Sequence, residues 1–200
     1  MLARLGDSPC RASVEDALGR SIPPHTRFAV ALLMTVAFVA DAKLARTGTP
    51  SVAFHATGPV GFKLVGTTSD LDVDDRGAQI VIKVPLQNLK TGIALRDRHM
   101  RDKYLEVSTY PNAELTVDRG TLHFPTGNDP VSGDATGVMA IHGKTKSTTF
   151  HYSIGRSGNT LHVVGTARLD IRDYGISIPS YLGVTVKPDI DVEVRFDAAE

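Results

Sequence analysis

A short basic stretch, Arg96-Asp97-Arg98-His99, contains the residues of this chain best suited to bind a polar group. On a helix, Arg96 and His99 are three residues apart and Leu95 and His99 are four apart, so all three share one face. A guanidinium and an imidazole beside an apolar face could hold the polar head of a ligand. A salt-bridged helix surface would use the same residue types, and the sequence leaves both interpretations open.

The stretch Gly143-Lys144-Thr145 matches the end of a phosphate-binding loop. That loop requires another glycine five residues before Gly143, and Val138 occupies the position. No helical pattern follows the stretch. We therefore expect a hairpin turn between two strands.

Three alternating carboxylates, Asp70, Asp72 and Asp74, resemble the start of a calcium-binding loop. Asp75 stands where that loop needs glycine, and Val81 stands where it needs glutamate. Alternation places the three carboxylates on one face of a strand. We expect a solvated strand face, with weak cation binding as the alternative.

The histidines and serines form no recognisable metal site or catalytic site. None of the seven histidines is paired at the spacing that presents two imidazoles to one ion, and His151 and His162 fall on the polar faces of predicted strands. Ser177 and Ser180 lie outside any nucleophile-elbow pattern. We expect no bound metal, no catalytic residue and no enzymatic activity.

Composition narrows the function classes further. The 200 residues include 22 Lys and Arg against 22 Asp and Glu, which predicts no basic surface for nucleic acid. Cys10 is the only cysteine, so the chain can form neither an intrachain disulfide nor a cysteine-based zinc site. With 42% hydrophobic residues, the chain can bury the core of a single domain.

The first 42 residues are typical of a secretory signal peptide. Residues 28–40 read FAVALLMTVAFVA, an apolar run too short for a bilayer span of about 20 residues. Arginines precede the run, and Ala40-Asp41-Ala42 provides a small-x-small cleavage site. We expect cleavage after Ala42, with translation starting at Met1 or downstream of it. An uncleaved anchor or a buried helix is the alternative.

After a linker at residues 43–50, period-two alternation predicts antiparallel strands in one domain at residues 51–197. Apolar residues alternate with polar ones, most cleanly in Ile190, Val192, Val194 and Phe196. Such alternation gives a sheet one dry face and one wet face. About eight short strands predict an all-β antiparallel barrel or sandwich.

One segment departs from this alternation. Residues 91–107 are dense in charge, and their apolar positions do not alternate. We expect a helical insertion of about ten residues there, ending before Pro111. A second short turn is expected at residues 170–174.

Four segments, in matching order and spacing, resemble the YceI-like family of exported lipid-binding proteins. They are VAFH at 52–55 with VGFKLVGT at 60–67; LKTG at 89–92 with RD-x-HM at 96–100, YL at 104–105 and YPNA at 110–113; GVMAIHGKTK at 137–146; and DYGI at 173–176 with Pro179 and Tyr181. The resemblance covers about residues 50–196.

The resemblance implies a lipocalin-like antiparallel β-barrel with a long apolar tunnel. It also implies a periplasmic or secreted protein that carries no metal or other cofactor and binds an isoprenoid, quinone-type or fatty-amide lipid. No integral membrane segment is expected after cleavage, and the edge strands of an incompletely closed barrel would permit a homodimer. The same fold could alternatively serve as a stress-response or partner-binding module with no physiological lipid.

A barrel of about eight strands either fills with side chains or holds one small ligand. Period-two alternation cannot separate these outcomes. If a ligand is held, we expect Arg96 and His99 to bind its head group at the tunnel mouth. The expected tunnel lining is Phe54, Phe62, Leu64, Ile80, Ile82, Val84, Phe150, Tyr152 and Ile154.

Overall fold

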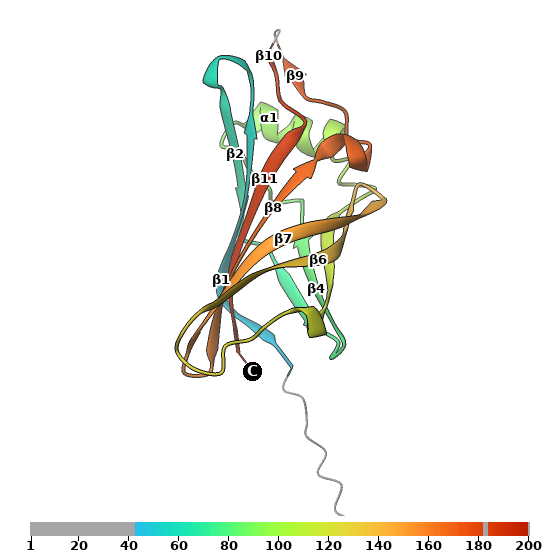
Figure 1. The fold of residues 1–200 in the computed structure, drawn as a ribbon. Helices are drawn as coiled ribbons and strands as arrows, with labels where there is room; N and C mark the ends of the chain where they lie inside the picture. Colours follow the sequence, from blue (N-terminus) through green and yellow to red (C-terminus); the bar gives the residue numbers. More distant parts are fainter. Residues whose placement is uncertain (1–42, 182–183, 200) are drawn as a thin grey trace, which may run out of the picture. The chain divides into compact units, whose positions relative to one another are not determined.

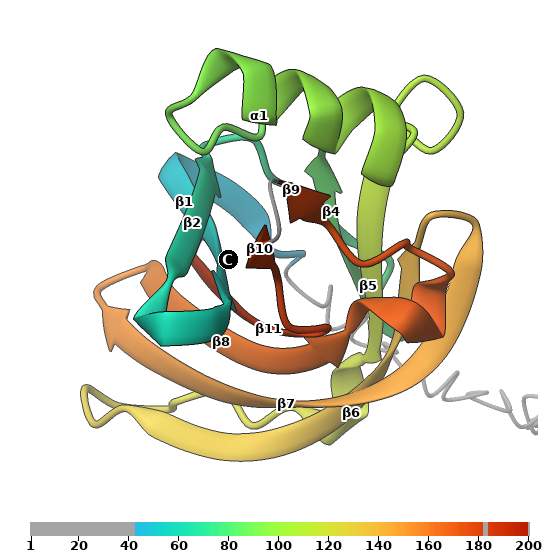
Figure 2. The same cartoon turned by 90° about the horizontal axis from the view of Figure 1, so that it is seen from above.

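The computed structural model describes residues 43–181 and 184–199; the predicted signal peptide at 1–42 lies outside them. Nine strands form one antiparallel sheet in the order β2-β1-β11-β8-β7-β6-β5-β4-β3, which curls into a barrel (Figures 1 and 2). The strands are β1 Ala45–Thr57, β2 Lys63–Thr68, β3 Asp72–Asp75, β4 Gln79–Pro85, β5 Asn112–Asp118, β6 Val131–Ile141, β7 Lys144–Ser157, β8 Thr160–Asp170 and β11 Asp189–Ala199. A separate ribbon pairs β9 (Ser180–Tyr181) with β10 (Val184–Thr185).

The expected all-β antiparallel class is confirmed, and the sheet has nine strands where about eight were expected. β3 has only four residues, two of its three aspartates are exposed, and Val73 is its one apolar side chain. A strand so short and so rich in charge gives little periodic signal. The expected solvated face is present at Asp72 and Asp74, which are exposed while Leu71 is buried. Asp70, expected on the same strand face, lies before β3, is half-buried and accepts a hydrogen bond from Asn88 at 2.7 Å.

Residues 45–50, expected to belong to a linker, are instead the first half of β1. Ala45 pairs with Ala199 on β11, and the register shifts between Thr47 and Ser51. This bulge interrupts alternation, and most side chains of this half are exposed, so the sequence pattern does not show the strand.

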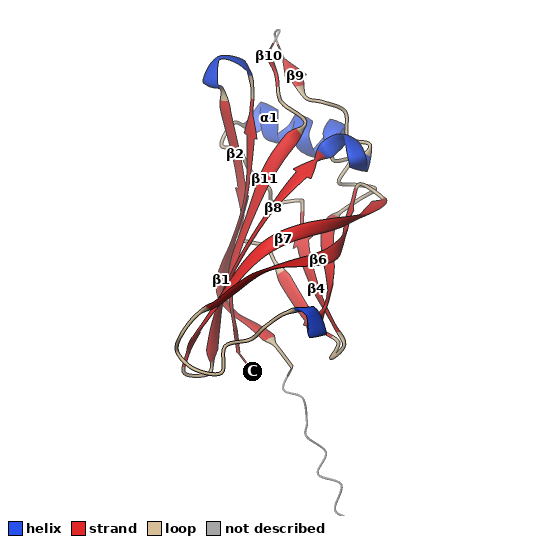
Figure 3. Cartoon of the chain, viewed as in Figure 1, coloured by secondary structure: helices blue, strands red, loops and turns tan. Residues whose placement is uncertain are grey.

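The helical insertion is present at the expected position. α1 (Ala94–His99) continues directly into a π-helical turn, η2 (Met100–Tyr104), where the Leu105 amide donates to the Met100 carbonyl. Three single turns complete the helical elements: η1 Pro59–Gly61, η3 Arg119–Thr121 and η4 Ile171–Tyr174. Figure 3 shows η1, α1 and η4 at one end of the barrel and η3 at the other.

The segment that resembles a phosphate-binding loop is a hairpin turn, as expected. Ile141 pairs with Lys144, and the two residues between them, His142 and Gly143, both have positive φ, of 52° and 71°. Such a turn matches the twist of the flanking strands. The turn joins β6 to β7 with no helix after it.

The edge strands β2 and β3 are tied into the barrel at separate points. Thr67 of β2 exchanges two backbone hydrogen bonds with Lys90, at 2.8 and 2.9 Å. At the other end, the Leu44 amide donates to Asp75 Oδ2 at 3.0 Å. These contacts hold the curled sheet closed without a continuous ladder between its edges.

Asp75 is the central acceptor of the closed end. Its buried carboxylate accepts hydrogen bonds from the amides of Leu44 and Gly77 and pairs with the Arg119 guanidinium of η3. Burial alone would raise the pKa of Asp75. The two amides and the attraction of Arg119 outweigh this effect and hold its pKa below the ordinary 3.8.

We predict that Asp75→Asn lowers the free energy of unfolding by about 1.5–3 kcal/mol near pH 7, because a charged acceptor of three donors is lost. A carboxylate with a lowered folded-state pKa stabilises the protein above its unfolded pKa, and this contribution disappears as the pH falls through the folded-state value. The free energy of unfolding of the variant should therefore fall less steeply than that of the unmodified protein as the pH drops below about 4. Urea unfolding at several pH values measures both effects.

The neighbouring Asp74→Asn is the matched control. Asp74 is exposed and forms an ion pair with the exposed Arg76, so its substitution should change the free energy of unfolding by less than about 1 kcal/mol. Equal losses in the two variants would contradict the role assigned to Asp75.

Candidate functional site

The barrel encloses a cavity of about 720 Å³ whose lining is almost entirely apolar. It lies inside the curled sheet, and the helical insertion α1 lies across one side of its open end (Figure 2). Every strand of the main sheet contributes to the lining, although β2 and β3 contribute one residue each, Leu64 and Val73. The dry face of the sheet therefore surrounds a void instead of a filled core.

All nine side chains expected to line a tunnel lie on this cavity. They are Phe54, Phe62, Leu64, Ile80, Ile82, Val84, Phe150, Tyr152 and Ile154. Several further wall residues were not predicted from the sequence, among them Met139, Leu169, Tyr174, Val194 and Phe196. Of these, Val194 and Phe196 belong to the alternating run of β11, which could have identified them.

Gly165 of β8 is a wall position of a different kind. It pairs with the lining residues Tyr152 and Val194, so any side chain introduced at this position would point into the cavity. A Cβ placed there would meet no atom within 4 Å. A glycine inside a strand is the one sequence signal that could have marked this position, because such glycines occur where another group approaches the backbone.

At the closed end, the segment that follows η3 forms a floor. Leu122 and Phe124 face the cavity, and the Arg119 guanidinium lies 5.2 Å from the centre of the Phe124 ring. The Tyr152 ring lines the cavity while its hydroxyl accepts a hydrogen bond from the His123 amide at 3.0 Å. The Tyr152 hydroxyl is thus hydrogen-bonded to the His123 backbone and not to the cavity. The floor exposes the apolar side chains of Leu122 and Phe124 and the Tyr152 ring to the cavity.

At the open end, Arg96 and His99 both line the cavity, as their shared helix face allows. Arg96 donates from Nε to Thr91 Oγ1 at 2.6 Å and from Nη2 to the Thr91 carbonyl at 2.7 Å. The His99 ring is exposed and makes no hydrogen bond to any residue within 43–181 or 184–199. Because a guanidinium has five donors, Arg96 can brace the loop and still donate to a ligand.

Asp97, one residue from Arg96, is buried and fixes the start of the helix. It accepts hydrogen bonds from the amide of Thr91 at 2.7 Å and from the Thr91 hydroxyl. Burial would raise the pKa of Asp97, but these hydrogen bonds and the nearby Arg101 and Arg96 hold it below its usual range. The hydrogen bonds among Thr91, Arg96 and Asp97 thus fix α1 at the edge of the cavity.

His142 anchors the far end of the insertion. Its Nδ1 lies 3.2 Å from the Tyr174 carbonyl, and its Nε2 lies 3.0 Å from Glu106 Oε2. The ring also packs against Tyr110, with centroids 4.7 Å apart. One side chain of the β6–β7 hairpin thereby joins the insertion to η4.

The remaining histidines and carboxylates form no further site in the described ranges. His151 and His162 are exposed, as expected, and their Nδ1 atoms lie 2.9 Å from Asp134 and 2.7 Å from Asp197. Within residues 43–181 and 184–199, no three His, Cys, Asp or Glu side chains are grouped so that they could hold a metal ion. No helix in these ranges is long and apolar enough to cross a membrane.

Known structures share this architecture. A polyisoprenoid-binding domain from Saccharophagus degradans superimposes with a TM-score of 0.66 at 15% identity, covering 78% of this chain and 98% of that domain. BcnA from Burkholderia cenocepacia superimposes with a TM-score of 0.61 at 15% identity, covering 75% and 96%. At these identities the likeness establishes the fold.

Sequence relatives extend over most of the chain. A UPF0312 protein of Pseudomonas putida is 26% identical over 172 residues, which is 78% of this chain and 87% of the relative. A UPF0312 protein of Vibrio cholerae is 28% identical over 129 residues, covering 59% and 62%. The family model of the YceI-like domain matches residues 38–198. On this match, and with a barrel of the same architecture, the chain belongs to the YceI-like domain family.

Proposed function

We propose that this protein binds a polyisoprenoid or a similar long-chain amphiphile in the barrel and carries or sequesters it without chemical change. The observation that supports this most strongly is the cavity itself: a void of about 720 Å³ with an apolar wall, an apolar floor and cationic and imidazole groups at its mouth. A small-molecule site has this character, with a mostly apolar lining and a few placed polar groups.

The physical driving force for such binding is hydrophobic. Each 100 Å² of apolar ligand surface removed from water contributes about 2.5 kcal/mol, before the costs of association. The wall offers no row of polar partners along its length, so a ligand chain that carries polar groups would lose their hydration without compensation. An uninterrupted hydrocarbon tail, as in a prenyl or quinone-type lipid or a fatty amide, avoids that loss.

The polar head of the lipid would lie at the mouth beside Arg96 and His99. Both groups line the cavity and come from the same helix face. Two hydrogen bonds to Thr91 fix the Arg96 guanidinium, so the Arg96 side chain loses little conformational entropy when a ligand binds. This arrangement suits a carbonyl, hydroxyl or amide oxygen, each of which accepts hydrogen bonds.

The proposal includes export to the periplasm or the exterior after cleavage behind Ala42. Its support is the apolar run at 28–40 with the small residues that follow it. The intact mass of the protein recovered from the exported fraction tests this directly. A chain beginning at Lys43 agrees with the proposal, and a full-length chain retained in the cytoplasm contradicts it.

We predict that the exported protein carries lipid through gentle purification, and that Gly165→Leu removes it. The new side chain would project into open space in the cavity without displacing the wall. Overpacking an occupied site costs about 1–3 kcal/mol, so retained lipid should fall about fivefold or more. Native mass spectrometry with organic extraction measures the stoichiometry and identifies the lipid.

Gly155→Leu is the matched control for this experiment. Gly155 lies on β7 opposite the outward-facing His162 and does not line the cavity. A Cβ added at Gly155 would likewise meet no atom within 4 Å, so this variant should fold and keep its lipid. A bare polypeptide mass for the unmodified protein would contradict lipid carriage and favour a partner-binding role for the barrel. Equal loading of both variants would instead contradict the binding of lipid in the cavity beside Gly165.

The head-group assignment makes a separate prediction. The double variant Arg96→Gln, His99→Asn should bind a prenyl alcohol about tenfold more weakly or worse, because a hydrogen bond from the charged guanidinium contributes about 1.5–3 kcal/mol and one from a neutral imidazole about 0.5–1.5 kcal/mol. Binding of an isoprenoid hydrocarbon without a head should not change. Fluorescence displacement with the two ligands measures both affinities.

Arg98→Gln is the matched control, since Arg98 is exposed on the same helix and does not line the cavity. Equal losses for the alcohol and the hydrocarbon would show that the double substitution damages the mouth as a whole and would contradict a head-group role.

A further inference from the structure

Large apolar side chains are exposed around the open end of the barrel. They come from three places that are far apart in sequence: the η1 turn, the start of α1 and the segment before β9. We call residues 58–63, 90–99, 176–181 and 184–188 the mouth rim. Its exposed large apolar residues are Val60, Phe62, Ile93, Leu95 and Ile178.

Three of these side chains are strongly exposed. Val60 is fully exposed, at 106%, and Ile93 and Leu95 are more than half exposed. Outside the mouth rim, only Val65 and Val138 are exposed large apolar residues in the described part of the chain, and both project from strands of the wall. A gathering of such side chains at one end marks an interaction surface.

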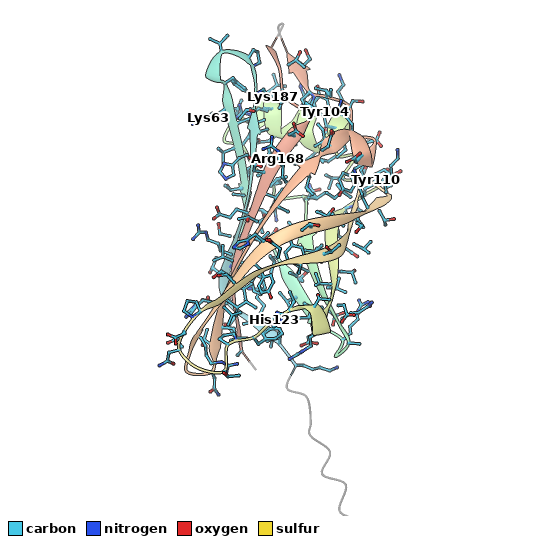
Figure 4. All side chains as sticks on the ribbon, in the orientation of Figure 1. Lys63, Tyr104, Tyr110, His123, Arg168 and Lys187 are labelled. Carbon is cyan, nitrogen blue, oxygen red and sulfur yellow. The ribbon has the colours of Figure 1, made fainter. Side chains whose placement is uncertain are left out.

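The pieces of the mouth rim are held together at one end of the barrel. The Lys187 amide donates to the Thr57 carbonyl at 2.7 Å, which joins the approach to β11 with the approach to η1. Figure 2 shows η1 and α1 at the edge of this end of the curled sheet and the β9–β10 ribbon over its centre. Lys63 and Lys187 lie at this end in Figure 4, whereas His123 lies at the opposite end.

The mouth rim is cationic in a chain that is neutral overall. It contains five basic residues, Lys63, Lys90, Arg96, Arg98 and Lys187, against a single carboxylate, Asp97. That carboxylate is buried and accepts hydrogen bonds from Thr91, so it contributes little negative charge to the exposed surface. The full chain has equal numbers of acidic and basic residues, and one of the five cations, Arg98, lies 3.9 Å from the carboxylate of Asp102 just beyond the rim.

We propose that the mouth rim docks on the surface of an anionic phospholipid bilayer. Exposed apolar side chains flanked by Lys and Arg bind the boundary between headgroups and acyl chains, where the cations meet lipid phosphates. The turn at η1, the helix α1 and the β9–β10 ribbon are separate projections at this end of the barrel. A fluid bilayer can adapt to such an uneven surface, whereas a folded protein partner would need a surface of complementary shape.

Docking in this orientation would connect the cavity with the lipid phase. Phe62, Ile93 and Leu95 are exposed to solvent and also line the cavity, so an apolar path continues from the interior to the mouth rim. A lipid tail could then move between bilayer and barrel without crossing water. This loading role rests on the proposed function, but the docking itself does not depend on it.

Co-sedimentation with vesicles tests the docking. The exported protein should bind vesicles of phosphatidylglycerol and phosphatidylcholine more strongly than vesicles of phosphatidylcholine alone, and added salt should weaken the binding. Each cation near an anionic surface contributes an attraction equivalent to about fivefold in partitioning. Lys63→Gln with Lys187→Gln should therefore lower binding more than tenfold. Neither residue lines the cavity.

The apolar contribution has its own matched pair of variants. Val60→Asp with Ile178→Asp should abolish vesicle binding, whereas Val138→Asp, an exposed valine on the outer wall, should leave it unchanged. Val60, Ile178 and Val138 do not line the cavity, so all these variants should retain cargo. Circular dichroism verifies that each variant is folded.

The outcomes distinguish docking from cargo binding. No binding to anionic vesicles at low salt, or equal losses in the Val138→Asp variant and the Val60→Asp, Ile178→Asp variant, would overturn the docking. So would a dimer that dissociates in the double variant while the unmodified protein ignores vesicles, because the mouth rim would then join two copies. Vesicle binding by a protein that carries no lipid would support docking while contradicting the proposed function.

Discussion

An apolar space that side chains leave open persists only when its wall resists collapse, and this constraint shapes the whole barrel. Close packing is the normal state of a protein interior, and empty apolar volume costs free energy. Here a continuous antiparallel ladder runs from β2 through β1 and β11 to β3, so the wall cannot contract without breaking backbone hydrogen bonds. The two tethers at Thr67–Lys90 and Leu44–Asp75 restrain its edges.

The two ends of the wall are built with opposite chemistry. At the floor, the Asp75–Arg119 pair and the Tyr152 hydroxyl direct their polar atoms away from the cavity and leave Leu122 and Phe124 facing it. At the mouth, a helix too short to be stable alone is held by Asp97 at its start and by His142 near its end. Polar groups reach the cavity mainly where the mouth opens.

Alternation along single strands predicts the barrel class and its dry face, because period two depends only on local sequence. Ile82 and Phe150 could therefore be assigned to the inside. Whether side chains fill the inside depends on which residues of neighbouring strands lie beside each other, and the sequence does not give this register. Gly165 is an example, because it is recognised as an inward-facing position only from its pairing with Tyr152 and Val194. In the sequence Asp75 is one more charge in an acidic run, because its burial arises from Leu44 and Arg119, which are distant in sequence.

The position of β1 has a consequence for how the chain folds. β1 lies between β2, its neighbour in sequence, and β11, with Ala45 opposite Ala199. The ladder therefore cannot close until β11 is available, because the β1–β11 pairing joins the two ends of the described chain, whereas the other pairs of the main sheet follow chain order. Such topologies fold slowly, since the entropy of closing a long loop is lost before the contacts form. The barrel of this protein therefore cannot close on the ribosome before β11 has been synthesised.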